Sequence, residues 1–358
     1  MRKSQLPKNI LIIRLSSLGD VVIASPIAQI LKRYNPNARI TWLVQPENKP
    51  AIENNPFIDE VICWDKDCWL TLFKQRKYAT LWRATRELQK KLHEHNFDTA
   101  FDLQGLFKSG FLTWLSGAKE RIGIGSREGS YWFMHKMVSR NIANRDQIGS
   151  DYRYLVNQMG YSDSDWPMIV HTSQPAITAA NALLDKYVKT DKFAVICPFT
   201  TREQKQWPEE HWQQLLLRVR GRYQLKPIIL GTNDETDTCE TLARNTGAIN
   251  LAGKTDLQEA THIMSRARLI IGVDNGLTHI AQTLDTPSIA MFGPSCPYLY
   301  SGNGSSKVLY MDLNCSPCRK PTCNKAYNCM KETTPDIVLG ELKQLFKLSP
   351  LNIQTQDL

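Results

Sequence analysis

The sequence predicts an α/β protein with two doubly wound, parallel sheets. Short apolar runs typical of buried strands alternate with helical patterns along the whole chain, as in parallel sheets covered by helices. The alternation pauses at residues 160–173, where Trp166-Pro167 and aspartates suit a linker. We therefore expect two domains, residues 1–165 and 174–358, facing a central cleft, which is where small molecules usually bind.

Composition narrows the class of protein. The chain has 358 residues, 42% of them hydrophobic, so it can bury a sizeable core. No apolar run approaches the roughly 20 residues that span a bilayer, and Ile10–Ile13 is too short for a signal-peptide core. We expect a cytoplasmic protein whose nine cysteines are thiols or metal ligands. The formal charge of +9 favours an acidic partner, but no zinc-finger spacing or arginine-rich tail points to nucleic acid.

Strands and helices follow in regular order in both halves. In the first half, we expect strands at residues 10–13, 39–44, 58–63, 99–103 and 121–124, and helices from Pro26, over most of 66–95, after 104–110 and at 151–159. In the second half, we expect strands at residues 193–197, 227–230, 269–273 and 288–292, and helices at 208–223, 237–245, 257–267 and 277–284. Ser25 before Pro26 is typical of an N-cap followed by proline at the first helical position.

The first strand leads into a turn that carries a carboxylate. Asp20 follows the buried run Ile10–Ile13 after a turn containing Ser16, Ser17 and Gly19. Ligands bind at this edge of open α/β sheets, so Asp20 is a candidate catalytic residue. An aspartate in such a turn more commonly caps a helix, and the turn alone leaves both roles open.

The segment 66–95 mixes basic and aromatic residues. Its members are Lys74, Arg76, Lys77, Arg83, Arg86, Lys90 and Lys91, among Trp69, Phe73, Tyr78, Leu81 and Trp82. One interpretation is the solvated face of an amphipathic helix. The other is a surface for an anionic, partly apolar ligand, because aromatic residues mixed with Lys and Arg suit a membrane interface.

Two strand ends in the second half suit a phosphorylated sugar. Thr200, Thr201 and Lys205 follow the strand at 193–197, and hydroxyls, a lysine and free helix-end N–H groups are what a diphosphate needs. After the strand at 269–273, Asp274 can accept hydrogen bonds from sugar hydroxyls. The N–H groups that follow can hold phosphate oxygens. Each motif alone is weak, because hydroxyl-rich turns are common, but together they support a ligand site.

Three segments resemble glycosyltransferase family 9, the bacterial lipopolysaccharide heptosyltransferases. They are Arg14-Leu-Ser-Ser-Leu-Gly-Asp20, Thr200-Thr-Arg-Glu-Gln-Lys205-Gln-Trp-Pro-Glu-Glu-His-Trp212 and Asp274-Asn-Gly-Leu-Thr-His279. The resemblance runs to about Pro294 and resumes at residues 335–346. The middle segment, with the string Asp-Leu-Gln-Gly-Leu-Phe-Lys-Ser at 102–109, most resembles the heptosyltransferase I type. The resemblance implies a GT-B fold of two Rossmann-like domains, with the acceptor on the first and an ADP-sugar on the second.

Residues at matching positions acquire roles from this resemblance. The family is inverting, so a base must deprotonate the acceptor hydroxyl, and Asp20 matches that base. Lys205 would offset charge on the departing ADP. Asn275 stands where the family usually has Ser or Thr. The donor ADP-L-glycero-D-manno-heptose would be held by Thr200, Thr201, Lys205, Glu235, Thr255, Asp274, Asn275, Gly276, Leu277 and His279.

The implied acceptor is the Kdo/inner-core region of lipid A. Its candidate contacts are Ser17, Gly19, Lys74, Arg76, Lys77, Arg83 and Lys108. We therefore expect an enzyme of lipopolysaccharide core biosynthesis that is peripheral to the cytoplasmic face of the inner membrane. With Lys205 and helix N-termini facing the diphosphate, we expect transfer to need no metal and no other cofactor.

The cysteine-rich segment 315–329 departs from the heptosyltransferase I type. Cys315, Cys318, Cys323 and Cys329 look more like heptosyltransferases II and III, so an acceptor that already carries heptose is an alternative. The four thiols are either a structural zinc site, reduced packing thiols or a redox-labile loop.

Two other functions fit less well. A nucleotide-dependent oxidoreductase would need Gly-x-Gly-x-x-Gly after a strand, and the sequence lacks it. A non-catalytic protein that binds anionic glycolipid would keep the basic surface but would not need Asp20 and Lys205 at strand ends.

Overall fold

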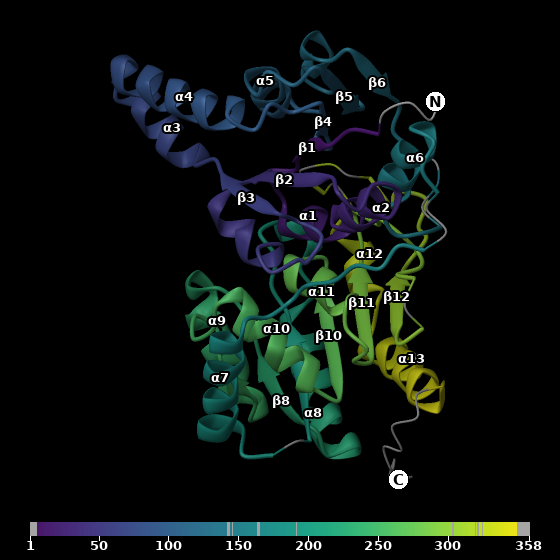
Figure 1. Ribbon diagram of the computed structural model, residues 1–358. Helices are drawn as coiled ribbons and strands as arrows, with labels where there is room; N and C mark the ends of the chain where they lie inside the picture. The colour runs from purple at the N-terminus through teal and green to yellow at the C-terminus, as the bar shows by residue number, and fades with distance from the viewer. Residues whose placement is uncertain are drawn as a thin grey trace. The chain divides into compact units, whose positions relative to one another are not determined.

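The chain divides into two compact units in the computed structural model (Figure 1). The structure describes residues 6–141, 144, 146–162, 165–190, 192–302, 304–318, 320, 322–323 and 325–348. One unit comprises Met1–Asn144 and Gly149–His171, and the other comprises Arg145–Ile148 and Thr172–Leu358. Within the described ranges, no helix has both the length and the apolar character that crossing a bilayer requires.

The first unit is built on a parallel sheet with the strand order β3-β2-β1-β4-β5-β6. Its strands are β1 (Asn9–Ile13), β2 (Arg39–Val44), β3 (Glu60–Cys63), β4 (Thr99–Asp102), β5 (Glu120–Ile124) and β6 (Lys136–Val138). Its helices are α1 (Leu18–Ala24), α2 (Pro26–Tyr34), η1 (Pro46–Ala51), α3 (Lys66–Lys74), α4 (Tyr78–His93), α5 (Phe107–Leu115), η2 (Ser130–Phe133) and α6 (Ser150–Gln158). The apolar run that forms β1 lies near the middle of this sheet, where both faces are covered.

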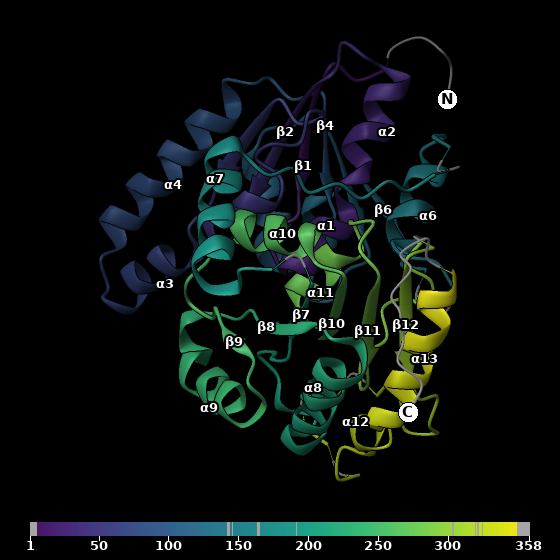
Figure 2. The same cartoon turned by 90° about the horizontal axis from the view of Figure 1, so that it is seen from below.

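The second unit repeats this plan with the strand order β12-β11-β10-β7-β8-β9. Its strands are β7 (Phe193–Cys197), β8 (Lys226–Ile229), β9 (Ile249–Asn250), β10 (Leu269–Val273), β11 (Ser288–Phe292) and β12 (Ser306–Tyr310). Its helices are α7 (Gln174–Leu183), η3 (Leu184–Val188), η4 (Glu203–Lys205), α8 (Glu209–Tyr223), η5 (Asn233–Glu235), α9 (Thr236–Thr246), α10 (Leu257–Arg266), α11 (Gly276–Ala281), α12 (Asn328–Lys331) and α13 (Pro335–Leu348). Figure 2 shows α8, α9, α12 and α13 around this sheet.

Each sheet has one point where the strand order reverses. In the first unit it lies between β1 and β4, where Ile13 pairs with Asp102. In the second unit it lies between β7 and β10, where Cys197 pairs with Gly272. Ligands of open α/β sheets bind outside the carboxyl ends of the strands at such points. Asp20 follows β1, and most of the candidate donor residues follow β7 and β10.

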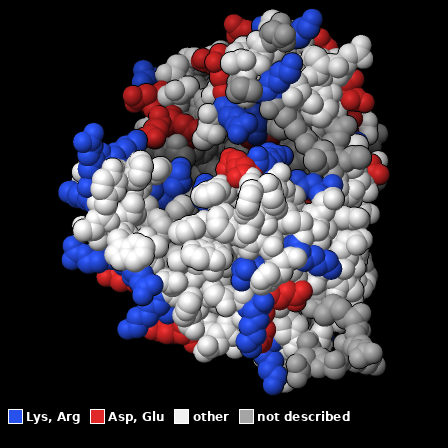
Figure 3. All heavy atoms as spheres, turned by 90° about the horizontal axis from the view of Figure 1, so that it is seen from above, with Lys and Arg blue, Asp and Glu red and all other residues white. Residues whose placement is uncertain are grey.

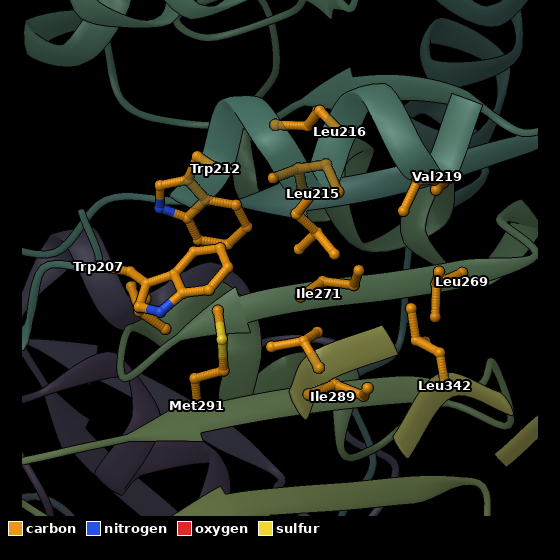
Figure 4. Packing of buried hydrophobic residues seen from close by; sticks show 14 of the residues in the cluster. Trp207, Trp212, Leu215, Leu216, Val219, Leu269, Ile271, Ile289, Met291 and Leu342 are labelled. Atoms are coloured by element: carbon orange, nitrogen blue, oxygen red, sulfur yellow. The ribbon is translucent and has the colours of Figure 1, made fainter. Parts of the chain in front are cut away.

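The core of the second unit holds the strand ends in place. Figure 4 shows Trp207 and Trp212 lying against Leu215 and Met291. The two indole rings pack edge to face with centroids 4.8 Å apart, and both are almost fully buried. Each buried aromatic side chain of this size stabilises the fold by about 2–3 kcal/mol.

The structure confirms the predicted class, two parallel sheets covered by helices, and corrects several elements. The helix expected within 66–95 is two helices, α3 and α4, because Arg76 between them has a left-handed backbone conformation (φ 56°) that a helix cannot contain. Ser25 precedes α2 as expected but does not cap it. Its backbone is already helical after α1, and its hydroxyl donates back to Val22 O. The strands β6, β9 and β12 were not expected, because they are short or polar edge strands with weak periodicity.

Candidate active site

The predicted donor residues lie along one edge of the second sheet. Thr200, Thr201 and Lys205 follow β7, Glu235 follows β8, Thr255 follows β9, and Asp274 to His279 follow β10. The parallel strands β7 to β10 all end at this edge, so the topology brings together residues that are far apart in sequence. The sequence alone places them only at strand ends.

Asp274 is the centre of a buried polar network. Its Oδ2 accepts hydrogen bonds from Lys205 Nζ at 2.7 Å and from the Ser295 hydroxyl. Its Oδ1 lies 3.2 Å from His279 Nε2. Because an ionised carboxylate only accepts hydrogen bonds, His279 Nε2 is the donor to Asp274. On the other side of the ring, Nδ1 forms a hydrogen bond of 2.9 Å with the Tyr298 hydroxyl.

The network keeps Asp274 ionised. Burial would raise the pKa of Asp274, but the hydrogen bond and charge of His279 and the charge of Lys205 outweigh it, and the pKa lies well below its usual value. The result is an ionised hydrogen-bond acceptor held in a fixed position beside the ammonium group of Lys205. The Lys205 side chain is 19% exposed and the Asp274 side chain 8%, so the pair is largely buried.

Asn275 joins two strand ends. Its Nδ2 donates to Cys197 O at 3.1 Å and to Phe199 O at 2.7 Å. Its Oδ1 accepts from Thr278 N at 2.8 Å and so caps α11. These contacts give the Asn275 side chain a positioning role, while the predicted contacts of Asn275 and His279 with a diphosphate stay predictions.

The loop that carries Lys205 is anchored at both of its ends. Gln206 Nε2 donates to Thr200 O at 3.3 Å, and the buried Trp207 Nε1 donates to Thr333 O at 2.7 Å. The Trp-Pro-Glu-Glu-His-Trp string therefore serves packing, and it fixes the lysine that precedes it.

The remaining donor candidates lie at the same edge with looser contacts. Glu235 Oε2 accepts from Thr232 N at 2.8 Å. Burial and then the charge of Glu235 raise the pKa of Cys197, the last residue of β7. Thr255 and the first α11 residues, Gly276 and Leu277, are half-buried, and Thr201 is exposed.

In the first unit, Asp20 is the third residue of α1. Its Oδ2 lies 2.5 Å from Arg14 Nη2 and accepts from the Ser17 hydroxyl at 2.9 Å. Ser17 N lies 3.4 Å from the same oxygen, which completes a capping box. The capping role is therefore present. The side chain is 45% exposed, so a substrate hydroxyl can also approach it.

Arg14, Ser295 and Tyr298 are site residues that the sequence analysis misses. Arg14 is buried and donates through Nη1 to Leu103 O at 2.9 Å. Burial lowers the pKa of Arg14, but Asp20 and its other neighbours raise it by more, so the guanidinium stays charged. One signal in the sequence was available for Arg14, which directly follows the apolar run Ile10–Ile13. An arginine at the end of a buried strand needs an anionic or hydrogen-bonding partner.

Lys108 lies in the first turn of α5, half-buried. Burial and then the charge of Lys66 lower the pKa of Lys108, and Arg14 adds to this effect. Lys108 therefore lies within electrostatic reach of both Arg14, beside Asp20, and the start of α3. The other predicted acceptor residues are spread more widely. Ser17 is exposed, Gly19 is buried, and Lys74, Arg76, Lys77 and Arg83 are exposed on α3, α4 and the turn between them.

The cysteines gather around one cavity. Cys315, Cys318, Cys323 and Cys329 line a space of about 530 Å³, and burial followed by the other three thiols raises the pKa of Cys329. However, no three His, Cys, Asp or Glu side chains in the described part of the chain are arranged to hold a metal ion. The arrangement therefore gives no preformed zinc site.

Comparisons with known proteins identify the family of this chain. The family profile described as "Glycosyltransferase family 9 (heptosyltransferase)" matches residues 85–328. Lipopolysaccharide heptosyltransferase 1 of Pseudomonas aeruginosa is 26% identical over 365 residues, covering 97% of this chain and 96% of the relative. Lipopolysaccharide heptosyltransferase 2 of Salmonella typhimurium is 24% identical over 355 residues, covering 94% and 98%.

Solved structures share the fold. The family 9 glycosyl transferase of Veillonella parvula has a TM-score of 0.78 at 20% identity and covers 96% of this chain and 98% of its own. E. coli heptosyltransferase WaaC with ADP-2-deoxy-2-fluoro heptose has a TM-score of 0.69 at 22% identity, covering 94% and 99%. The two parallel sheets are thus those of a GT-B fold. Because the profile covers more than half of the chain, this protein belongs to glycosyltransferase family 9, the heptosyltransferase family.

Proposed function

We propose that this enzyme transfers heptose from ADP-L-glycero-D-manno-heptose to the Kdo/inner-core region of lipid A in lipopolysaccharide core biosynthesis. The observation that carries the proposal is the pairing of Lys205 with the ionised Asp274 at the reversal point of the second sheet. A sugar diphosphate needs a cation for its phosphates and an acceptor for its hydroxyls, and these two residues supply both. The relative from Pseudomonas aeruginosa, named lipopolysaccharide heptosyltransferase 1, supports the choice of sugar.

Positive charge and hydrogen-bond donors bind the diphosphate of the ADP-sugar and stabilise ADP as it leaves. Lys205 and the N–H groups after β10 bind the diphosphate, and Thr200 and Thr201 add hydroxyl donors. Asp274 accepts from heptose hydroxyls, while Glu235 and Thr255 lie on the nucleoside side. As the bond between C1 of heptose and the phosphate oxygen breaks, the electron pair leaves with ADP, and Lys205 stabilises the added negative charge.

The acceptor is activated by Asp20. Its carboxylate takes the proton of the acceptor hydroxyl as that oxygen attacks C1 from the face opposite ADP, which inverts the configuration. Arg14 and Ser17 fix the orientation of the carboxylate through Oδ2. The transfer needs no redox step and no bound cofactor, because a general base and a stabilised leaving group complete it.

The acceptor carries carboxylates and phosphates, and Lys108 is a candidate cation for them that interacts electrostatically with Arg14. The exposed lysines and arginines of α3 and α4 extend the positive surface from there. The acyl chains of the acceptor are anchored in the membrane. The enzyme therefore acts at the membrane surface, on the cytoplasmic face of the inner membrane.

A second acceptor is favoured by the cysteine-rich segment. The segment 315–329 resembles that of heptosyltransferases II and III, and a relative named lipopolysaccharide heptosyltransferase 2 matches 94% of this chain. On this alternative the acceptor already carries a heptose.

One assay separates these acceptors. The enzyme is given ADP-heptose with Kdo₂-lipid A and heptosyl-Kdo₂-lipid A side by side, and products are read by mass spectrometry. Product from the first acceptor alone supports the proposal, and product from the second alone moves the assignment to type II or III. Transfer to neither overturns the heptosyl assignment. If no ADP-sugar shifts the melting temperature either, a non-catalytic protein that binds anionic glycolipid becomes the alternative to test.

A further inference from the structure

The helices α3 and α4 form an exposed pair whose composition differs from the rest of the chain. Residues 66–93 contain eight Lys or Arg and only two Asp or Glu. This segment thus supplies +6 of the formal charge of +9 on the whole chain. Figure 3 shows blue Lys and Arg atoms clustered around white ones at the left edge, where these helices lie, with little red among them.

The apolar residues of this pair form one ridge near its turn. Leu70 and Phe73 are three residues apart on α3, and Tyr78 and Trp82 are four apart on α4, so each pair shares a helix face. The Phe73 and Tyr78 rings meet edge to face with centroids 5.9 Å apart and join the two faces. All four side chains are exposed, by 42% for Leu70 up to 64% for Trp82.

The base of the pair is fixed to the first unit. Trp69 and Leu88 pack against its core cluster, and Leu92 is part of that cluster. The Trp64 and Trp69 rings also meet edge to face at 5.5 Å. The exposed ridge is therefore held on an anchored support, while α3 itself contains no buried residue.

We infer that the α3–α4 pair is a membrane-docking element that inserts this ridge into the interface of an anionic bilayer. Aromatic and leucine side chains favour the boundary between headgroups and acyl chains, and the surrounding lysines and arginines pair with anionic headgroups. The Arg86 guanidinium lies over the Trp82 ring, 5.8 Å from its centre. This contact keeps a cation next to the aromatic side chain that would enter the interface. The strong excess of one charge selects a lipid surface rather than a protein of mixed charge.

This inference rests on the membrane location in the proposed function and assigns it to a particular element. It requires no glycolipid, which separates it from recognition of the acceptor sugars by residues such as Lys108. The ridge residues Phe73 and Trp82 are also not among the residues that we assign to acceptor or donor.

Vesicle flotation tests the docking element. The full chain is mixed with vesicles of phosphatidylethanolamine and phosphatidylglycerol that contain no lipopolysaccharide, at 0.1 M salt. The wild type should float with these vesicles and bind pure phosphatidylcholine vesicles at least about tenfold more weakly. The double variant Phe73→Ser/Trp82→Ser should bind the anionic vesicles at least about tenfold more weakly than the wild type. The matched control is Tyr300→Ser, which removes an equally exposed ring from the second unit and should not change binding.

Two further readouts separate insertion of the ridge from adsorption by charge alone and from recognition of the acceptor. Brominated lipids should quench the tryptophan fluorescence of the wild type more than that of Trp82→Phe. Transfer to a deacylated, water-soluble acceptor should be within twofold of wild type in the double variant. Undiminished vesicle binding by the double variant, or binding only when Kdo₂-lipid A is present, would overturn the inference. Vesicle binding without any heptose transfer by the wild type would leave the inference standing and remove the proposed function.

Discussion

Lys205 Nζ lies 2.7 Å from Asp274 Oδ2, although the two residues belong to loops that follow different strands. The contact exists because β7 and β10 are neighbours at the point where the strand order reverses. The same carboxylate is held by His279 and Ser295. A cation and an anion are thus kept together and largely buried, in a position where a sugar diphosphate can engage both.

Removal of Lys205 should impair the donor site and the fold together. In Lys205→Ala, the buried Asp274 loses its cation, and we expect the free energy of unfolding to fall by about 1–3 kcal/mol. The affinity for ADP should fall at least about tenfold, because a charge-assisted contact to phosphate is lost. Chemical denaturation and calorimetric titration with ADP measure the two effects.

The double variant Lys205→Ala/Asp274→Asn provides the control for this prediction. Neutralising the stranded carboxylate should restore part of the stability but none of the ADP affinity. Strictly additive stability losses would show that the two residues do not interact.

Acidification should weaken the second unit through Asp274. Its pKa is lowered in the folded protein, so its stabilising contribution is complete above the unfolded pKa of about 3.9 and is lost as the pH falls towards the folded value. The melting temperature of the wild type should therefore fall more steeply below about pH 4 than that of Asp274→Asn. Asp234→Asn, which removes an exposed carboxylate from η5, should retain the wild-type profile. Equal slopes for the wild type and Asp274→Asn would contradict the prediction.

Asp20 should be required for turnover but not for donor binding. Because a positioned base contributes about 10²–10⁴ in rate, Asp20→Asn and Asp20→Ala should lower kcat by that factor. The thermal shift caused by ADP-heptose should remain. Asn retains an oxygen that can accept from the Ser17 hydroxyl, so Asp20→Asn also controls for loss of the capping contact. Substantial activity in either variant would exclude Asp20 as the base.

Asn275 should stabilise the second unit through both the oxygen and the nitrogen of its side-chain amide. Asn275→Ala removes the cap of α11, one bond to the last residue of β7 and one bond to the loop after it, and we expect the free energy of unfolding to fall by about 2 kcal/mol. Asn275→Asp keeps the capping oxygen but sets a carboxylate oxygen against the Cys197 and Phe199 carbonyl oxygens, so its loss should be at least as large. If both variants unfold like the wild type, the cross-loop bonds contribute nothing measurable.

Transfer should continue in the presence of EDTA. Lys205 and backbone N–H groups supply the positive charge that a divalent ion would otherwise bring to the diphosphate. We expect kcat within twofold of the untreated enzyme after EDTA and exhaustive dialysis. Loss of activity that Mg²⁺ restores would show that the charge of Lys205 is insufficient.

The interior strands of both sheets and the polar residues at their ends could be predicted from the sequence. The apolar runs of β1, β7 and β10 lie in sheet interiors, where burial on both faces leaves an unmistakable pattern. The polar residues that follow them were therefore identified at strand ends, as for Asp20, Lys205 and Asp274. The edge strands β6, β9 and β12 were not predicted, since short or partly exposed strands lack that pattern.

The sequence did not predict which side chains from different strands form hydrogen bonds with one another. The sequence places Asp274 and His279 in one turn, but only the folded chain brings Ser295 and Tyr298 to them. Asn275 shows the same limit, because only the folded chain reveals that its amide also joins the ends of β7 and β10.

What the sequence by itself determined was the order of elements, the strand ends and the residue types available there, because these depend on local periodicity and turn chemistry. What only the tertiary structure decided was which of those residues meet. The pairing of β7 with β10 and of β1 with β4 is a choice among many strand orders, and it is made by long-range packing of the sheet. That choice sets Lys205 against Asp274, and it places Arg14 and Asp20 at the reversal point of the other sheet.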